Sequence, residues 1–166
     1  LGNSENRYLY LAGTTSTSIT EMKIDNNCRF IGYSAVSWCS VLANITIPDS
    51  VTSIDNGAFF NCSGLTSVTI GNSVTSIGGA AFGYCSRLTS ITIGNSVTTI
   101  GGSAFYGCTR MKTVYYRGAA EEWNKLAIDS DNDKLTSATR YYYSETKPEV
   151  EGNFWHYNDK NEIAEW

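Results

Sequence analysis

The chain has 166 residues, a formal net charge of −4 and 42% hydrophobic residues, which is enough to bury a substantial core. Nucleic acid binding needs a basic surface, and this mildly acidic chain offers none. No apolar run is long enough to span a bilayer, so we expect no membrane insertion. The chain starts at Leu1 without a signal peptide, which fits a mature or trimmed protein.

The first segment, residues 1–18, has no match elsewhere in the chain. Tyr8 and Tyr10 alternate there with Leu9 and Leu11, a pattern that favours a short strand. A run of small polar residues follows and predicts a loop. We interpret this segment as an N-terminal cap or a linker.

The middle of the chain repeats with a period of 23 residues. Residues 42–64, 65–87 and 88–110 are three copies without insertion or deletion, and residues 19–41 are a fourth, divergent copy with the same apolar positions. Residues 111–117 begin a fifth. A fixed period in the twenties indicates a solenoid, in which each unit stacks on the next.

Each unit predicts one coil. Val68 and Ile70 alternate with Ser67 and Thr69 in a strand, and Gly71-Asn72 turns the chain. Residues 74–77 predict a second extended stretch, and residues 78–85 a single helical or 3₁₀ turn. Two inward columns should stack from coil to coil, one of phenylalanine and one of alanine: Phe59, Phe82 and Phe105, and Ala35, Ala58, Ala81 and Ala104.

These residues also carry a family resemblance over about 19–117. Leu65, Val68 and Ile70 fit L-x-x-L-x-L, and the run that follows, up to Cys85, resembles the BspA-like leucine-rich repeat of bacterial surface proteins. The resemblance implies a right-handed, β-rich solenoid of the α/β leucine-rich-repeat type. Ser50, Ser73 and Ser96 stand where Asn27 keeps the usual asparagine, and we expect these serines to form a shorter version of the asparagine ladder.

Four of the five cysteines, Cys39, Cys62, Cys85 and Cys108, recur at the repeat period. They therefore occupy one position in successive coils, and we interpret them as a column of buried free thiols. A disulfide framework and a metal site are the alternatives. Neither has a C-x-x-C or Cys/His cluster to support it, and the sequence leaves the redox state open.

Residues 118–166 break the repeat and predict a C-terminal cap over the open end of the solenoid. The pattern indicates an amphipathic helix at about 119–128, a loop at 129–133 and a strand at 138–144. A β-hairpin around Asp159-Lys160 should end the chain.

Catalysis finds little support in the sequence, so we predict no enzyme and no cofactor. His156 is the only histidine, and it lies in an aromatic hairpin strand where packing is its expected role. Asp129, Asp131 and Asp133 have the spacing that starts a calcium loop, but Lys134 and Arg140 replace its essential Gly and Glu. A solvated acidic loop, without a metal, is the better interpretation.

The outward side of the regular sheet is the candidate binding face. One column across the coils holds small hydroxyl groups in its middle and charged or aromatic groups at its ends, and Arg117 ends a nearby column. Together the residues Lys23, Thr46, Thr69, Thr92, Tyr115 and Arg117 form this face, called the outward face below. Alternatively, threonine is simply a good strand former at exposed positions.

We therefore predict a non-catalytic, secreted or cell-surface module for protein–protein recognition. Adhesion to host extracellular matrix or to a neighbouring cell is what the resemblance implies. A structural spacer in a larger surface protein is one alternative. A carbohydrate-binding module is another, and it would use exposed Tyr and Trp groups near the C-terminal end.

Overall fold

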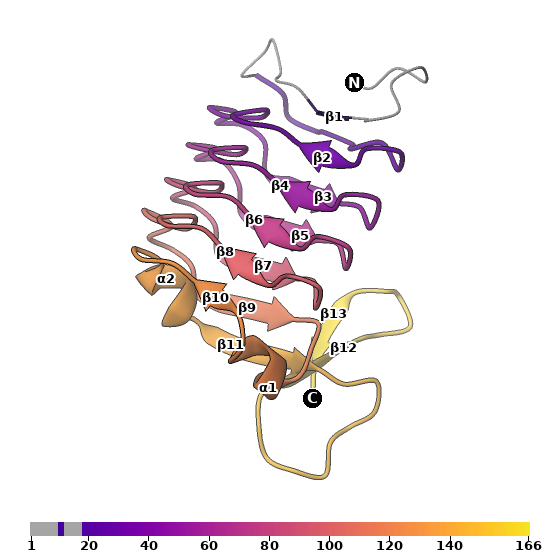
Figure 1. Ribbon diagram of the computed structural model, residues 1–166. Coiled ribbons are helices and arrows are strands. Elements are labelled where there is room, and N and C mark those ends of the chain that lie inside the picture. Colours follow the sequence, from indigo (N-terminus) through magenta and orange to yellow (C-terminus); the bar gives the residue numbers. More distant parts are fainter. Residues whose placement is uncertain (1–9, 12–17) are drawn as a thin grey trace.

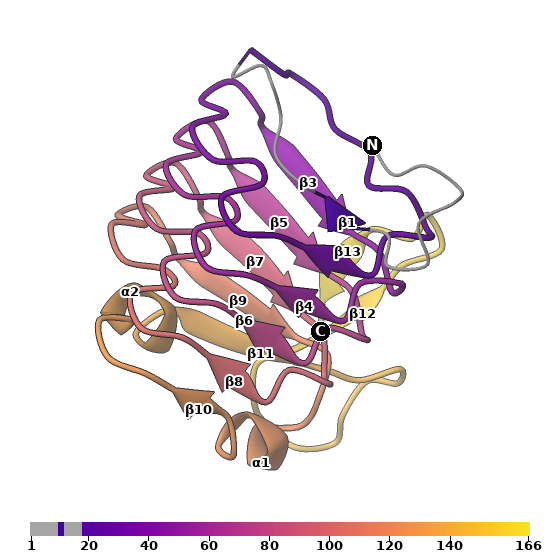
Figure 2. The same cartoon turned by 45° about the horizontal axis from the view of Figure 1, so that its top comes forward.

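Each of the three regular repeats (42–64, 65–87 and 88–110) wraps once around a shared core, and its two extended stretches enter two different sheets (Figures 1 and 2). The computed structural model describes residues 10–11 and 18–166. The predicted cap or linker at residues 1–18 lies almost wholly outside the described residues. Within it, β1 (Tyr10–Leu11) pairs with β2 (Phe30–Ile31).

The longer strands form a seven-stranded sheet that is parallel except at its last pair. Strands in successive coils pair in register, so Ile45 lies opposite Val68 and Val68 opposite Ile91. In sheet order the strands are β13 (Ile163–Glu165), β12 (Phe154–Tyr157), β11 (Thr139–Tyr143), β9 (Thr113–Tyr116), β7 (Ser90–Ile93), β5 (Ser67–Ile70) and β3 (Asn44–Ile47).

The shorter strands form a six-stranded parallel sheet, which is the second extended stretch predicted for each repeat. Each has two residues, and the second points its side chain into the core wherever a repeat supplies the strand. In sheet order they are β1, β2 (Phe30–Ile31), β4 (Ser53–Ile54), β6 (Ser76–Ile77), β8 (Thr99–Ile100) and β10 (Ala127–Ile128).

The third side of each coil consists of turns rather than the helical or 3₁₀ turn predicted from residues 78–85. Two residues per coil adopt left-handed backbone conformations there. In the third repeat they are Ala80, with φ of 52°, and Tyr84, with φ of 59°. Between these two residues, every second backbone N–H points toward the next coil. Ala80, Phe82 and Tyr84 thus donate their N–H groups to carbonyls of that coil. The turns are therefore hydrogen-bonded between coils as the sheets are.

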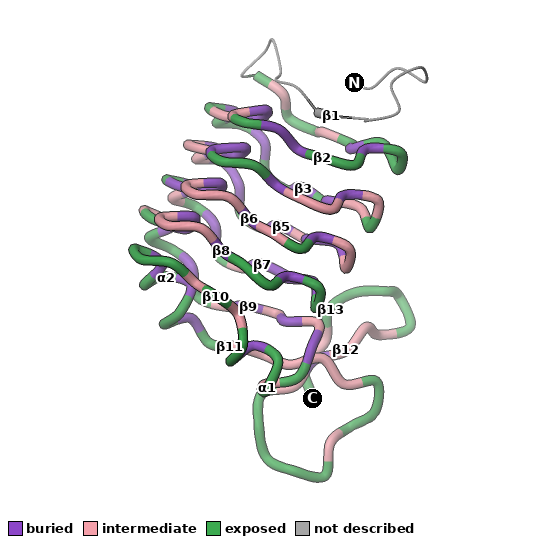
Figure 3. The backbone as a smooth tube through the Cα atoms, in the orientation of Figure 1, coloured by how far each residue is buried: buried purple, intermediate pink, exposed green. Residues whose placement is uncertain are grey.

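The core lies between the three sides and runs the length of the stack (Figure 3). The expected phenylalanine column is confirmed: Phe59 and Phe82 stack with centroids 5.1 Å apart, and Phe82 and Phe105 with centroids 5.4 Å apart. The alanine column is fully buried, as expected. The divergent repeat fills the same core positions, because Ile24, Ile31 and Cys39 are buried.

The chain after residue 117 continues the coil instead of leaving it. The predicted helix at 119–128 is too long, since α1 spans only Ala120–Trp123 and Ala127–Ile128 forms β10, paired with β8. A second helix, α2 (Asp133–Thr136), follows, and β11 then pairs with β9. The predicted hairpin is confirmed as β12 and β13. A division at residue 118 into repeats and cap stays a prediction, and strand pairing crosses it.

Candidate functional site

Strand register sets the middle of the outward face. Thr46, Thr69, Thr92 and Tyr115 lie on four neighbouring strands, each directly opposite the next. Tyr115 in turn lies opposite Tyr141 of β11. Because successive residues of a strand point to opposite faces, these side chains all point away from the core.

The two halves of this face differ in access. Thr46 is exposed and Thr69 is half-buried, but Thr92 is only 2% exposed. Thr92, although part of the predicted outward face, is therefore covered and not accessible to a partner. At this end the C-terminal hairpin packs on the outward face, because the Tyr115 hydroxyl donates a 2.9 Å hydrogen bond to Glu165 of β13.

Aromatic rings cover the face around this contact. Trp155 is fully buried, and its indole N–H donates to the Tyr116 carbonyl at 3.0 Å. Its ring meets those of Tyr115, Tyr143 and Tyr157 edge to face, with centroids 5.7, 5.1 and 5.1 Å apart. The prediction of exposed tryptophan near the C-terminal end is thus wrong for Trp155. No sequence pattern revealed that the hairpin folds back onto the sheet.

Arg117 belongs to the same packed end. Its guanidinium donates a hydrogen bond to the Tyr157 hydroxyl and lies 5.5 Å from the centre of that ring.

Burial, reinforced by the Glu165 carboxylate, raises the pKa of the Tyr115 phenol to about 12. Tyr115 therefore keeps its proton at neutral pH and serves as a hydrogen-bond donor.

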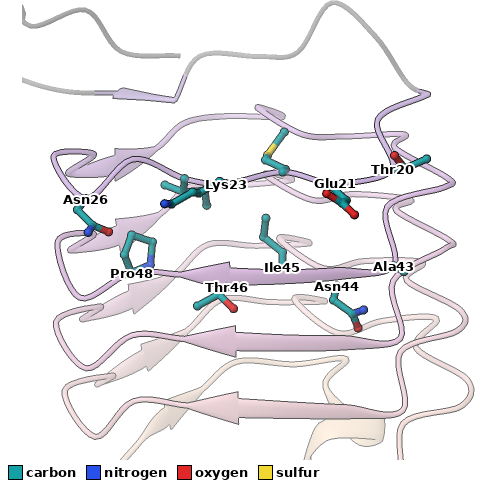
Figure 4. A pocket seen from close by; sticks show the side chains of 11 residues that line it. Thr20, Glu21, Lys23, Asn26, Ala43, Asn44, Ile45, Thr46 and Pro48 are labelled. Atoms are coloured by element: carbon teal, nitrogen blue, oxygen red, sulfur yellow. The ribbon is translucent and has the colours of Figure 1, made fainter. Parts of the chain in front are cut away.

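The other end of the face is open. The segment around Lys23 runs beside β3 without joining it, because the seven-stranded sheet ends at β3 (Figure 4). Between this segment and β3 lies a surface hollow of about 510 Å³. It is bordered by one carboxylate, one ammonium group and neutral polar side chains, among them Glu21, Lys23, Asn44 and Thr46. The strand that the repeat pattern places at Lys23 does not form, although Met22 and Ile24 still pack on the core.

The expected serine ladder is wrong, because the buried Ser50 hydroxyl has no hydrogen-bond partner. Threonine makes the ladders instead. Hydroxyls of the column Thr52, Thr75 and Thr98 donate to carbonyls 23 residues earlier, at 3.2, 3.1 and 3.1 Å. Thr66 and Thr89 form a second such column. The recurrence of these threonines every 23 residues was the sequence signal for the ladders. Surface threonines of the repeat recur in the same way, so the sequence alone did not separate the two groups.

The cysteine column is confirmed as buried free thiols. The sulfhydryls of Cys62, Cys85 and Cys108 donate to the carbonyls of Val36, Phe59 and Phe82 at 2.9, 3.3 and 3.2 Å. Burial raises the pKa of Cys62 and Cys108 to about 12, and raises the pKa of Cys85 well above its usual value. A protonated, enclosed thiol is a poor nucleophile, so the column serves packing.

The remaining candidates sit at the surface or in packing contacts. His156 stacks on Trp166 with centroids 3.8 Å apart, in agreement with its predicted role. Asp129, Asp131 and Asp133 are exposed. Across residues 18–166, no three His, Cys, Asp or Glu side chains gather closely enough to hold a metal ion.

A buried asparagine at the end of the turn column was missed. Asn132 is 3% exposed, and its side-chain oxygen accepts the Phe105 N–H at 3.0 Å. Its side-chain nitrogen donates to the carbonyls of Gly101 and Asp129, both at 3.0 Å, and to that of Ser130 at 3.3 Å. Asn132 thus supplies the bonds that a further coil would supply, and because it lies outside the repeats no periodic position marks it in the sequence.

These features together, coils of 23 residues with two parallel sheets and a continuous core, define a leucine-rich-repeat solenoid. The chain belongs to the family described as BspA type leucine rich repeat region (6 copies), which matches residues 14–133. The predicted family and fold class are both confirmed.

Two solved structures support the assignment. A leucine rich cell surface protein from Faecalibacterium prausnitzii A2-165 is 33% identical, with a TM-score of 0.53 over 68% of this chain and 36% of that one. The leucine rich repeat protein of T. pallidum is 25% identical, with a TM-score of 0.52 over 71% of this chain and 57% of that one. This chain therefore spans only part of the length of either protein. No curated protein matches it.

Leucine-rich repeats of this family indicate a protein-interaction module. The helices within residues 18–166 are all too short and too polar to cross a membrane.

Proposed function

We propose that this chain is a non-catalytic recognition module displayed on a bacterial cell surface, and that it binds a protein partner through the open half of its outward face. The family and the similarity to a bacterial cell surface protein support this proposal. Adhesion to a host matrix protein or to a neighbouring cell is the role that fits such a module.

One observation carries the choice of face. The hydroxyl column is exposed at Thr46 and half-buried at Thr69, whereas beyond it the hairpin packs on Tyr115. Lys23 and Glu21 flank the open half and offer a partner both signs of charge. A firm sheet with short side chains loses little conformational entropy on binding and lets a protein surface approach closely. In this proposal Arg117 and Tyr115 brace the hairpin and do not contact the partner.

The test is binding to an array of purified matrix proteins by the chain and two matched variants. Thr46→Glu places a charged, bulkier side chain on the open half, and we expect it to weaken binding at least tenfold, or about 1.4 kcal/mol. Thr99→Glu makes the same change at an exposed strand residue of the other sheet and should bind as the unchanged protein does.

Equal binding by both variants would move the contact away from the outward face. A failure to bind any protein in the array would favour the structural spacer, whose only task is to hold another domain away from the cell.

A further inference from the structure

A line of aromatic side chains, three of them exposed and one half-buried, runs along the turns, on the side of the stack away from both sheets. Trp38, Phe60, Tyr84 and Tyr106 come from four successive coils, and neighbouring ring centroids lie 6.0, 5.5 and 5.4 Å apart. Each pair meets edge to face, with interplanar angles of 65°, 76° and 78°. These four residues are called the aromatic ladder below.

The ladder depends on an alternation between two adjacent sequence positions. Phe60 and Tyr106 occupy one position of the repeat, whereas Trp38 and Tyr84 occupy the next. In the coils that follow Phe60 and Tyr84, the position left over is glycine, whereas Asn61 holds it in the coil that follows Trp38. A Cβ added at Gly83 would lie 3.1 Å from the Phe60 ring, and one added at Gly107 would lie 2.9 Å from the Tyr84 ring. Glycine in one coil thus makes room for the ring of the coil before it.

This packing holds the rings in place without hiding them. Trp38 is 58% exposed, Tyr84 is 47% exposed and Tyr106 is 48% exposed. Because each ring is braced by its neighbour, a ligand stacking on it pays little in lost side-chain freedom. The hydroxyl groups of Tyr84 and Tyr106 add polar atoms at the rim.

A surface hollow of about 410 Å³ lies at the C-terminal end of the ladder. Its walls include the rings of Phe60, Tyr84 and Tyr106, and its polar groups are the Ser103 hydroxyl and the Asp131 carboxylate. Ser130 donates a 3.0 Å hydrogen bond to one Asp131 oxygen and so orients the carboxylate. Among the residues that the structure describes, no Lys or Arg borders the hollow. Aromatic walls with a few acceptors and hydroxyls suit a neutral ligand rich in hydroxyl groups.

We propose that the aromatic ladder and this hollow form a binding site for a neutral, β-linked polysaccharide. Sugar rings in such a chain expose C–H groups on their faces, which stack on aromatic rings, and hydroxyls at their edges, which donate to a carboxylate. A contact that recurs once per coil matches a ligand that is itself a repeating polymer. The site lies on a different side of the coil from the outward face, so it does not depend on the protein partner proposed above.

Binding can be measured by titration calorimetry with cellohexaose, xylohexaose and chitohexaose as probes. We expect saturable binding of at least one of them, weakened about tenfold in both Tyr84→Ala and Tyr106→Ala. Asp131→Asn should also weaken binding, and Asn tolerates the positive φ of 62° at this position. Tyr33→Ala is the matched control, because Tyr33 is an exposed tyrosine of the same side outside the ladder, and it should change nothing.

The unchanged protein provides a readout that does not depend on a variant folding. In amide NMR spectra, the bound probe should shift the signals of Gly83, Ser103 and Gly107. Absence of binding to all three probes would overturn the proposal, as would full affinity in both tyrosine variants. A third outcome would also overturn the proposal. If the protein binds a polyproline peptide but no oligosaccharide, and Tyr84→Ala and Tyr106→Ala weaken that binding, the ladder is a peptide site.

Discussion

Threonine residues at different positions of one repeat have different structural roles. Thr46 and Thr69 lie within long strands and point away from the core. Thr75 and Thr98 lie just before the short strands, where the hydroxyl reaches a carbonyl of the preceding coil. Each such bond contributes roughly 1 kcal/mol. Position in the coil thus separates threonines that stabilise the stack from threonines free for binding.

The cysteine column makes a prediction about reactivity. Iodoacetamide should label none of the five cysteines rapidly in the native protein, because all are buried, and should label all five in urea. Mass spectrometry of tryptic peptides separates the sites. Rapid native labelling at Cys62, Cys85 or Cys108 would contradict the buried column.

The same column makes stability depend on alkaline pH. The folded pKa of Cys62 and Cys108, about 12, lies above the ordinary value of 9.0, so the folded state holds these protons more tightly. Their contribution is therefore complete below pH 9.0 and is lost as the pH rises from there toward 12. Urea midpoints should fall over this window, and should fall less in Cys62→Ala. An equal fall in both proteins would contradict a contribution from Cys62.

The turn of each coil is the element in which local preference and stacking conflict. Its two left-handed positions hold Ser34, Gly57, Ala80 and Ser103 in one column, and Trp38, Asn61, Tyr84 and Gly107 in the other. A residue other than glycine costs about 1–2 kcal/mol in this conformation. The conformation persists because it directs N–H groups toward the carbonyls of the next coil, as from Ala80 to Gly102 at 3.0 Å.

Two neighbouring alanines test this account with opposite signs. Ala80→Gly should raise the free energy of unfolding by about 1 kcal/mol, because glycine adopts positive φ without a steric penalty. Ala81→Gly should lower it by about 1 kcal/mol, because Ala81 is fully buried and outside the left-handed region. Urea denaturation of both variants measures the difference, and destabilisation by both would disprove the strain.

At the scale of the whole molecule, the two described ends of the stack differ in how far other segments cover them. Toward the N-terminus the seven-stranded sheet stops at β3 and leaves a hollow, which keeps that part of the outward face open. Toward the C-terminus the stack is closed on two sides. Asn132 ends the turn column, and Trp155 packs over the last strands of the sheet. In a solenoid each coil is supported only by its neighbours, so closure at one end stabilises the coils next to it first.

Removal of the Asn132 side chain should therefore act locally. Asn132→Ala leaves the buried Phe105 N–H without its partner and removes one of the two hydrogen bonds to the Gly101 carbonyl, and we expect a loss of about 2–3 kcal/mol. Hydrogen exchange should rise at residues 101–108 before it rises at residues 55–62. Asn95→Ala removes an exposed asparagine and should stay within about 0.5 kcal/mol of the unchanged protein. Uniform acceleration along the chain would argue against end closure by Asn132.

The sequence by itself determined the period, the family, the inward columns and the register of the middle strands. Each follows from the repeat alone, because equal spacing in the chain becomes equal position in the coil. For that reason the stacking of Phe59, Phe82 and Phe105 could be predicted from the sequence, and so could the column of buried cysteines. The outward direction of Thr46 and Thr69 followed from strand alternation.

Tertiary structure decided what happens where the repeat ends or where two positions cooperate. The burial of Thr92, the packing of Trp155 and the bonds of Asn132 arise from contacts between segments whose spacing carries no period. The aromatic ladder joins two repeat positions across coils, so neither column alone revealed it. Periodicity fixes a residue's place within its own coil, and only the folded chain shows which side chains from other segments reach that place.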